Sequence, residues 1–326
     1  MTSAVRISAP SRLHFGLLRF ACPDGLSYGG LGMTIDAPRT VVQLQASSEW
    51  RAEGPLAERA LAFAKLAMRS CRPHESSAIT LHVCQAPPPH SGLGTGTQLA
   101  LAVARGIREL WQLPQACAAE LAASVDRGKR SAVGSHGFLQ GGLIWETGRR
   151  SEDSLGSLAR RIAIPNHWRV LLLSRPQQSG LYGDREMTAF EGLPPVPPQV
   201  TDKLQRLAKE SILPAAENDD FEIFAEAIHD YGRLAGSCFA TVQGGSFASP
   251  AIEQLVDRLR KLGIHGAGQS SWGPTVFALA EDEDQAAEFV DRVEALRRGT
   301  NTAVVAPDNL GARVEKIAPD PEGAAT

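Results

Sequence analysis

The spacing of apolar positions in the first 50 residues predicts β structure. VRIS (5–8) and RTVVQLQAS (39–47) alternate apolar and polar residues, as half-buried strands do. We expect a further strand over LHFGLLRF (13–20), after an interruption at Pro10, and a glycine-rich turn at SYGGLGM (27–33). The N-terminal segment should therefore consist of strands joined by this turn.

The pattern then switches between helical and extended spacing. Residues 56–71 carry Ala, Leu and Lys at helical spacing and predict an amphipathic helix, whereas ITLHVCQ (79–85) alternates as a strand does. Strong helix formers follow Thr97, and the segment 114–128 begins with proline and ends with glycine, as many helices do. A polar and basic stretch follows at 127–138, then a hydrophobic strand is expected over 141–148 and a loop over 150–160.

The second half mixes both patterns without the regular βαβ rhythm of a doubly wound sheet. Helices are predicted over 201–212, 221–236, 252–263 and 282–298, strands over 168–176, 275–280 and 302–307, and a proline-rich loop over 180–198. This order favours two α+β domains, 1–162 and 163–318, followed by a disordered tail at 319–326.

Composition narrows the function classes. The 326 residues carry a net charge of -3, so no overall field favours nucleic acid or an acidic membrane, and we expect small-molecule partners. No apolar run approaches the roughly 20 residues of a membrane span, and no signal peptide precedes the first strand, which favours a cytoplasmic protein. The five cysteines (Cys22, Cys71, Cys84, Cys117 and Cys238) are widely spaced, which predicts reduced and mostly buried thiols.

The stretch HSGLGTGTQ (90–98) is the first candidate site. A strand, a glycine-rich turn and a helix N-terminus can direct several backbone N–H groups at one anion. The spacing matches neither G-x-G-x-x-G nor the lysine-bearing phosphate loop, so a plain tight turn is an equal alternative. The candidate phosphate-binding residues are Ser91, Gly92, Gly94, Thr95, Gly96, Thr97 and Gln98.

A second glycine-rich stretch, GAGQSSWGP (266–274), repeats this chemistry in the other half. Gly268, Gln269 and Ser270 are candidates for phosphate binding, and an ordinary loop between a helix and a strand is the alternative. Two such loops, one in each domain, favour a shared cleft.

Two further stretches carry polar groups suited to anions. RGKRSAVGSHGF (127–138) gathers basic residues among serines and glycines, as anion sites do, although a solvated charge cluster has the same composition. Its candidate residues are Arg127, Arg130, Ser131 and Ser135. In APSRLHFGLL (9–18), Arg12 and His14 alternate with apolar neighbours and would face one side of a strand, toward either a cleft or solvent.

The acidic pair in NDDFEIF (218–224) suggests Mg²⁺ at first sight. The residues that follow are helical, so Asn218 to Asp220 are better explained as the N-cap and first turn of that helix.

Taken together, these stretches resemble the GHMP superfamily, named for galacto-, homoserine, mevalonate and phosphomevalonate kinases. PPPHSGLGTGTQLA is similar to its phosphate loop and GAGQSSWGPTVFAL to its C-terminal motif. APSRLHFGLL, YGGLGMTID and RGKRSAVGSHGFLQGGLIWETG resemble, within it, the β-ribofuranosylaminobenzene 5'-phosphate synthases, as a bacterial-type homologue. The resemblance implies an N-terminal domain like ribosomal protein S5 domain 2 and a ferredoxin-like C-terminal domain.

The resemblance also implies a reaction. That family couples 5-phosphoribosyl pyrophosphate to 4-aminobenzoate, releases CO₂ and pyrophosphate, and serves methanopterin biosynthesis. Mg²⁺ accompanies the diphosphate, and a homodimer is common for the fold. We expect Arg12, His14 and Arg130 to be the catalytic residues, with Arg12 holding the carboxylate of the acceptor.

Two alternatives stay open. Many GHMP kinases carry an aspartate in a phrase comparable to Ser131-Ala132-Val133-Gly134, where this chain has Gly134, which weighs against an ATP-dependent small-molecule kinase. The chain also departs from the synthase pattern. Arg19 is near the place where archaeal members usually have an acidic residue, and Leu26 and Tyr28 precede Gly29-Gly30 where they tend to have an arginine and an acidic residue. A non-catalytic ligand-binding homologue is therefore the third possibility.

Overall fold

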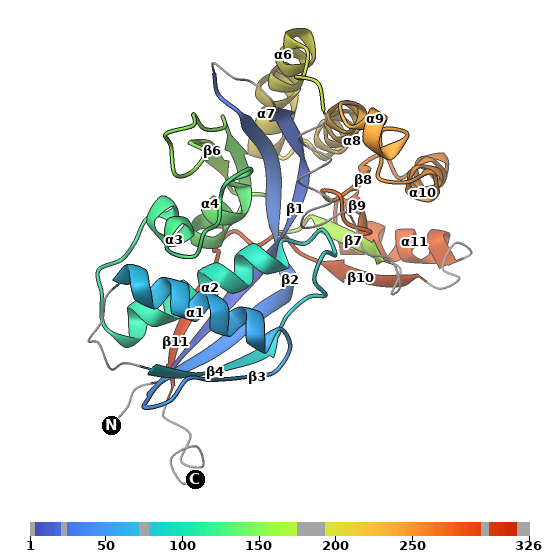
Figure 1. Ribbon diagram of the computed structural model, residues 1–326. Helices are drawn as coiled ribbons and strands as arrows, with labels where there is room; N and C mark the ends of the chain where they lie inside the picture. Colours follow the sequence, from blue (N-terminus) through green and yellow to red (C-terminus); the bar gives the residue numbers. More distant parts are fainter. Residues whose placement is uncertain (1–3, 21–24, 72–77, 175–192, 295–299, 318–326) are drawn as a thin grey trace.

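The computed structural model describes residues 4–20, 25–71, 78–174, 193–294 and 300–317 (Figure 1). Two sheets organise these residues. A seven-stranded sheet has the core order β11-β1-β2-β4-β3, with β5 on β2 and β6 on β5, and a four-stranded sheet has the order β10-β7-β9-β8. The expected α+β architecture in two parts is confirmed.

The first sheet is built mainly from antiparallel pairs. Its strands are β1 (Ala4–Arg19), β2 (Tyr28–Ser47), β3 (Arg51–Glu53), β4 (Ala78–Gln85), β5 (Leu143–Glu146), β6 (Leu158–Ile162) and β11 (Arg313–Ile317). Only the short β3–β4 pair is parallel among them. The alternation predicted for 5–8 and 39–47 places Val5, Ile7 and Val42 in the core under the helices.

The glycine-rich turn predicted at 27–33 is wrong, because β2 begins at Tyr28 and runs through it. A Cβ at Gly30 would lie 2.5 Å from the carbonyl oxygen of Gly16, and one at Gly32 would lie 2.3 Å from that of Leu13. These glycines allow the backbones of β1 and β2 to approach closely, where the register shifts between His14 and Gly16.

Helices α1 (Ala57–Cys71) and α2 (Thr95–Leu110) lie across one face of this sheet, close to the predicted ranges (Figure 1). Helix α3 (Ala118–Ser124) starts later than expected, after Cys117 and beyond Pro114. Helix α4 (Val133–Gln140) begins inside the polar and basic stretch 127–138, for which the sequence predicted no helix. Its Val133 and Phe138 are fully buried, and this burial outweighs the low helix propensity of its glycines.

The second sheet contains β7 (Arg169–Ser174), β8 (Ala267–Gln269), β9 (Val276–Ala280) and β10 (Asn301–Val305). The helices of this half are α6 (Pro198–Arg206), the π-helical η1 (Leu207–Ile212), α7 (Leu213–Glu217), α8 (Phe221–Ser237), α9 (Ala240–Gln243), α10 (Pro250–Lys261) and α11 (Glu283–Val293). The N-cap expected before 221 is confirmed, since the Asp220 side chain accepts a hydrogen bond from Ile223 N–H.

Residues 313–317, placed in the second domain by sequence, pair instead with β1 as strand β11 of the first sheet. Four of the five residues of β11 are exposed, so its pattern gave no strand signal. The predicted tail and most of the loop 180–198 lie outside the described residues.

The thiols do not match the expectation of burial, because Cys84 and Cys117 are exposed and Cys71 and Cys238 are half-buried. Cys22 lies outside the described residues. Among the helices that the structure describes, none has the length and apolar character to cross a bilayer.

The two halves share a core around the far part of β1. Leu13, Phe15 and Leu18 belong to the same buried cluster as Phe224 and Tyr231 of α8. The rings of Phe15 and Phe277 lie 5.4 Å apart, centroid to centroid. This strand therefore fixes the relative position of the two halves at the place where the cavity opens.

Candidate active site

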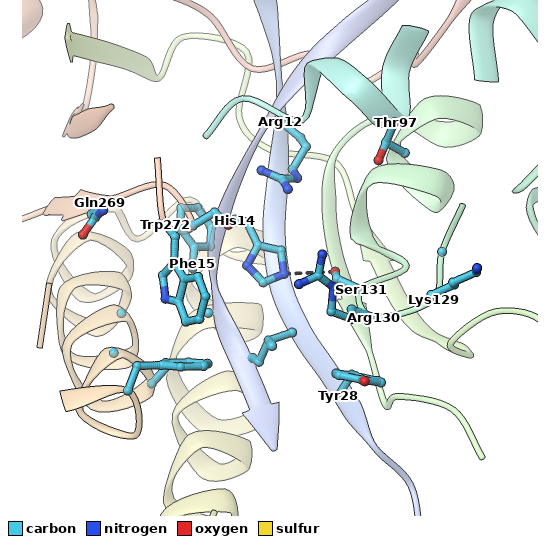
Figure 2. Close-up of a pocket in the computed structure, with 18 of the residues that line it drawn as sticks. Arg12, His14, Phe15, Tyr28, Thr97, Lys129, Arg130, Ser131, Gln269 and Trp272 are labelled. Carbon is cyan, nitrogen blue, oxygen red and sulfur yellow. Dashed lines mark hydrogen bonds between the residues drawn. The ribbon is translucent and has the colours of Figure 1, made fainter. Parts of the chain in front are cut away.

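A cavity of about 590 Å³ lies between the two halves. Figure 2 shows Arg12, His14 and Ser131 along its centre, with Phe15 and Trp272 on one side and Lys129 and Thr97 on the other. Its walls come from β1, the first turn of α2, the segment 126–131, helix α8 and the loop after β8. The β-bulge between His14 and Gly16 lies at this wall, which is where such irregularities re-aim side chains.

The two glycine-rich loops touch each other beside this cavity. A Cβ at Gly92 would lie 2.4 Å from the carbonyl oxygen of Ser270 and 3.0 Å from Gly273 Cα. The Ser270 hydroxyl donates to Gly92 O at 2.7 Å and accepts from His14 N–H at 3.1 Å. Ser271 N–H in turn donates to His14 O at 2.9 Å. Both loops and β1 are therefore joined in one hydrogen-bonded unit.

The first loop places the N-terminus of α2 beside the cavity. Gly94 is the N-cap, with φ of 78°, a left-handed conformation that favours glycine. The Arg12 guanidinium donates from Nη1 to Gly92 O at 2.7 Å, and Thr97 lines the cavity. The N-terminal end of the α2 dipole is positive, as is the Arg12 guanidinium, so the local electrostatic potential favours an anion.

The segment 126–131 forms the cationic wall. Arg127, Lys129 and Arg130 all line the cavity, and Lys129 also forms a salt bridge with Asp126 at 2.7 Å. Burial lowers the pKa of Arg127, and the neighbouring charge of Arg59 lowers it further. Guanidinium groups held together in this way are suited to binding phosphate oxygens.

A buried polar chain supports the centre of the cavity. His14 Nε2 lies 3.0 Å from Ser131 Oγ, and that hydroxyl donates to Glu146 Oε1 at 2.7 Å. Ala132 N–H donates to the same carboxylate oxygen at 2.7 Å. Burial, with a smaller effect of Arg12, lowers the pKa of His14 to about 3, so its imidazole is neutral at neutral pH. Burial raises the pKa of Glu146 to about 7.

The opposite wall is aromatic. Phe15, Phe239, Phe247 and Trp272 line it, and the rings of Phe239 and Trp272 meet edge-on with centroids 4.9 Å apart. Small residues of α8, Gly232, Ala235 and Gly236, complete the surface. None of these was singled out from the sequence. Trp272 could have indicated this wall from the sequence, because an aromatic residue is unusual among the small residues of GAGQSSWGP.

Backbone strain gathers at the same cavity. Tyr28, Asp126 and Ser271 line it and have positive φ of 66°, 56° and 56°. Left-handed backbone at a residue other than glycine is costly; it persists where the surrounding structure fixes the geometry, and such residues cluster at active sites.

The predicted site residues fall into two groups. Those that line the cavity are Arg12, His14, Thr97, Arg127, Arg130, Ser131 and Gln269. Those that do not line it are Ser91, Gly92, Gly94, Thr95, Gly96, Gln98, Ser135, Gly268 and Ser270.

Most of the second group has a local structural contact. Thr95 Oγ1 donates to Pro88 O at 3.2 Å, and Gln98 Nε2 donates to Gly134 O at 3.0 Å. A Cβ on Gly268 would lie 2.7 Å from the Phe277 ring. Gln269, although at the cavity, uses its amide to donate to Gly273 O at 2.7 Å. These contacts hold the two loops in their conformations.

Comparison with known proteins now decides the family. Residues 57–140 match the GHMP kinases N terminal domain and residues 212–297 match GHMP kinases C terminal. The beta-ribofuranosylphenol 5'-phosphate synthase of Methanothermobacter thermautotrophicus is 31% identical over 297 residues, which cover 85% of this chain and 89% of that one. The chain belongs to the GHMP kinase superfamily.

Two further matches extend this result. The enzyme of the same name from Archaeoglobus fulgidus is 27% identical over 328 residues, covering 95% of this chain and 99% of the other. A crystal structure of homoserine kinase from Cytophaga hutchinsonii has a TM-score of 0.67 at 15% identity, covering 96% of this chain and 97% of that one. This structural match shows the GHMP fold alone.

The positions at which this GHMP chain departs from its relatives can now be located. Gly134 lies in the first turn of α4, where a Cβ would be 3.4 Å from Thr97 Cγ2. Gly134 therefore faces Thr97 of α2 without a side chain. Arg19 and Tyr28 lie opposite each other in the β1–β2 pair, and Tyr28 lines the cavity.

Metal binding was tested on the residues present. Within the described ranges, no group of three or more His, Cys, Asp or Glu side chains is arranged to hold a metal ion. Mg²⁺, however, commonly binds through one or two carboxylates together with waters and substrate phosphates. Asp126 and the Thr97 hydroxyl line the cavity. They fit a metal that is held mainly by the diphosphate of a substrate.

Proposed function

We propose that this protein is a decarboxylating ribosyltransferase. It would join 5-phosphoribosyl pyrophosphate to 4-hydroxybenzoate or 4-aminobenzoate and release CO₂ and pyrophosphate, as a step in methanopterin biosynthesis. The observation that carries the proposal is the division of one cavity into a cationic wall and an aromatic wall, with Arg12 and His14 between them. A phosphorylated sugar and an aromatic acid together need both walls.

The cationic wall would act on the leaving group. Breaking the bond between C1 and the diphosphate oxygen sends the electron pair to pyrophosphate and leaves positive charge on the ribosyl ring. Arg127, Lys129 and Arg130, with the α2 N-terminus, would stabilise that leaving diphosphate. Asp126 and Thr97 would hold the Mg²⁺ that travels with the diphosphate, and the metal would neutralise part of its charge.

The aromatic wall would hold the acceptor. Its ring would pack against Phe239 and Trp272, with the carboxylate toward Arg12. The ring carbon that bears the carboxylate then bonds to C1. Loss of CO₂ returns the electron pair of the carbon–carboxylate bond to the ring and restores aromaticity. No general base is needed, because CO₂ leaves where a proton ordinarily would.

This chemistry agrees with the neutral state of His14. A histidine whose pKa is lowered to about 3 is not a general acid near neutral pH. It serves instead as a neutral hydrogen-bonding group, oriented by Ser131 and Glu146. The similarity to two synthases named for a ribofuranosylphenol product supports an acceptor with a ring hydroxyl.

The reaction is tested with carboxyl-labelled acceptors. The purified protein is incubated with 5-phosphoribosyl pyrophosphate, Mg²⁺ and either 4-hydroxybenzoate or 4-aminobenzoate, and labelled CO₂ is collected. We expect release with at least one acceptor, and none when Mg²⁺ is chelated. If both substrates bind and no label is released, the protein is a ligand-binding homologue and the proposal fails.

An ATP-dependent kinase is the second candidate, because the fold is that of homoserine kinase and a phosphate loop is present. A thermal-shift comparison of ATP with 5-phosphoribosyl pyrophosphate separates the two. A ligand that binds the folded state raises the unfolding midpoint temperature. A higher midpoint with ATP, and no change with 5-phosphoribosyl pyrophosphate, would favour the kinase.

A further inference from the structure

Arg59, near the start of α1, lies at the phosphate loop although nothing in its sequence context distinguishes it from a solvated helix residue. A Cβ added to Gly96 would be 2.7 Å from Arg59 Nη2, so this guanidinium lies directly against the first turn of α2. Any side chain at position 96 would displace it. The absence of a side chain there allows a cation to reach the helix N-terminus.

Arg59 and Arg127 share one aromatic ring. The Arg59 guanidinium carbon is 5.7 Å from the centroid of the Phe63 ring, and that of Arg127 is 4.8 Å from it. Stacking on an aromatic ring holds a guanidinium in place while leaving its edge N–H groups available for hydrogen bonds. Phe63 is buried in the helix core, so the ring is a rigid base for both side chains.

The two charges are close to each other and partly withdrawn from water. Burial lowers the pKa of Arg59, and both burial and the charge of Arg59 lower that of Arg127. Within residues 4–20, 25–71, 78–174, 193–294 and 300–317, neither guanidinium forms a salt bridge with a carboxylate. Two like charges gathered at the positive end of a 16-residue helix repel each other, and a bound anion would remove that cost.

We propose that Arg59 and Arg127, based on Phe63, form with the first turn of α2 a subsite for one phosphate group. The subsite opens to the cavity through Arg127 and Thr97, while Arg12 and Arg130 lie nearer His14. It rests on the proposed function, since a substrate with phosphate at both ends of a ribose needs two separated anion sites. The subsite would bind a phosphate group of 5-phosphoribosyl pyrophosphate, either the 5-phosphate or one phosphate of the diphosphate.

The test is calorimetric binding of two probes, ribose 5-phosphate and inorganic pyrophosphate, to the full chain. Arg59→Gln removes the charge and keeps much of the side-chain length. Lys65→Ala removes one positive charge from an exposed position of the same helix and is the control. Thermal unfolding of each variant establishes that it is folded.

We expect Arg59→Gln to weaken at least one probe about tenfold or more, as loss of a charged hydrogen bond does, with Lys65→Ala close to wild type. Arg59→Lys should restore only part of the affinity, because an ammonium lacks the planar stacking fork. The probe that loses affinity identifies which phosphate the subsite takes.

Three outcomes would overturn the subsite: neither probe weakened, equal weakening by Lys65→Ala, or no binding of either probe to wild type. None of these measurements involves turnover. If Arg59→Gln loses phosphate binding while the wild type releases no labelled CO₂, the subsite stands and the proposed reaction falls.

Discussion

The two glycine-rich loops have similar compositions and different contacts. In the first, Gly92 to Thr97, the glycines make room for cations, Arg12 beside Gly94 and Arg59 beside Gly96, at a helix N-terminus. In the second, Gly266 to Pro274, the polar groups are used inside the protein: Gln269 bonds to Gly273 and Ser270 to Gly92. Composition alone therefore does not show which contacts a glycine-rich loop makes, and residues of both loops line the cavity: Thr97 from the first, and Gln269, Ser271 and Trp272 from the second.

The contact between the loops can be broken at Gly273. A Cβ there would lie 2.2 Å from Gly92 N and 2.3 Å from Gly92 Cα, which are backbone atoms that cannot turn aside. Gly273→Ala should therefore lower the free energy of unfolding by about 2–3 kcal/mol, as overpacking does. Urea denaturation measures it, with Gly25→Ala as the control, since nothing lies within 4 Å of a Cβ at Gly25. An unchanged midpoint for Gly273→Ala would show that the loops do not depend on each other.

Arg130 tests the binding side of the comparison. Arg130→Ala should weaken pyrophosphate by roughly tenfold to a hundredfold, about 1.5–3 kcal/mol, because a charged hydrogen bond to the anion is lost. The free energy of unfolding should change far less. Arg150→Ala, at an exposed position, is the control. Equal losses of binding and of stability would instead assign Arg130 a structural role.

The buried carboxyl behind the cavity predicts a pH dependence of stability. The pKa of Glu146 is about 7 in the folded state, above its ordinary 4.5, so the folded state holds the proton more tightly. Stability relative to Glu146→Gln should fall as pH rises from about 5 to about 8, by on the order of 1–3 kcal/mol. Urea denaturation across this range measures the difference, and Glu152→Gln, an exposed carboxyl, should show no such trend. A flat difference would mean that Glu146 is ionised throughout.

The smallest effects should separate the loops most cleanly. Ser270→Ala removes a hydroxyl that bonds to Gly92 and His14, so it should cost about 1 kcal/mol of stability. Thr97→Val, at the cavity, should cost about 1 kcal/mol of pyrophosphate affinity instead. Denaturation and calorimetry on both variants give a two-by-two comparison. If the two losses are exchanged, the assignment of roles to the loops is wrong.

Much of the fold could be predicted from periodicity. The helix expected at 56–71 is α1 and the strand expected at 79–85 is β4, because their patterns match their burial. Several elements were missed, and two of them show the physical reason. The glycines of 27–33 serve a close strand approach rather than a turn, and α4 contains two glycines that fit it against Thr97 and Thr34.

The candidate site was only half visible in the sequence. Arg12, His14 and Arg130 stand in motifs, so their types and spacing indicated anion chemistry before the cavity was known. Arg59 and Phe239 stand in ordinary helical or linking segments. Tertiary packing brings them near the cavity, and the spacing of residues in a sequence does not predict such packing. The aromatic half of the cavity therefore needed the structure.

The return of β11 to the first sheet affects how the chain is made. Strand β1 pairs along Ala4 to Ser8 with residues 313–317, which lie far away along the chain. A ribosome must release residues 313–317 before this pair can form, so this edge of β1 stays uncovered while the intervening residues are synthesised. An exposed edge invites pairing with other chains. We therefore expect deletion of residues 313–317 to expose this edge of β1 and to lower the free energy of unfolding of the first sheet.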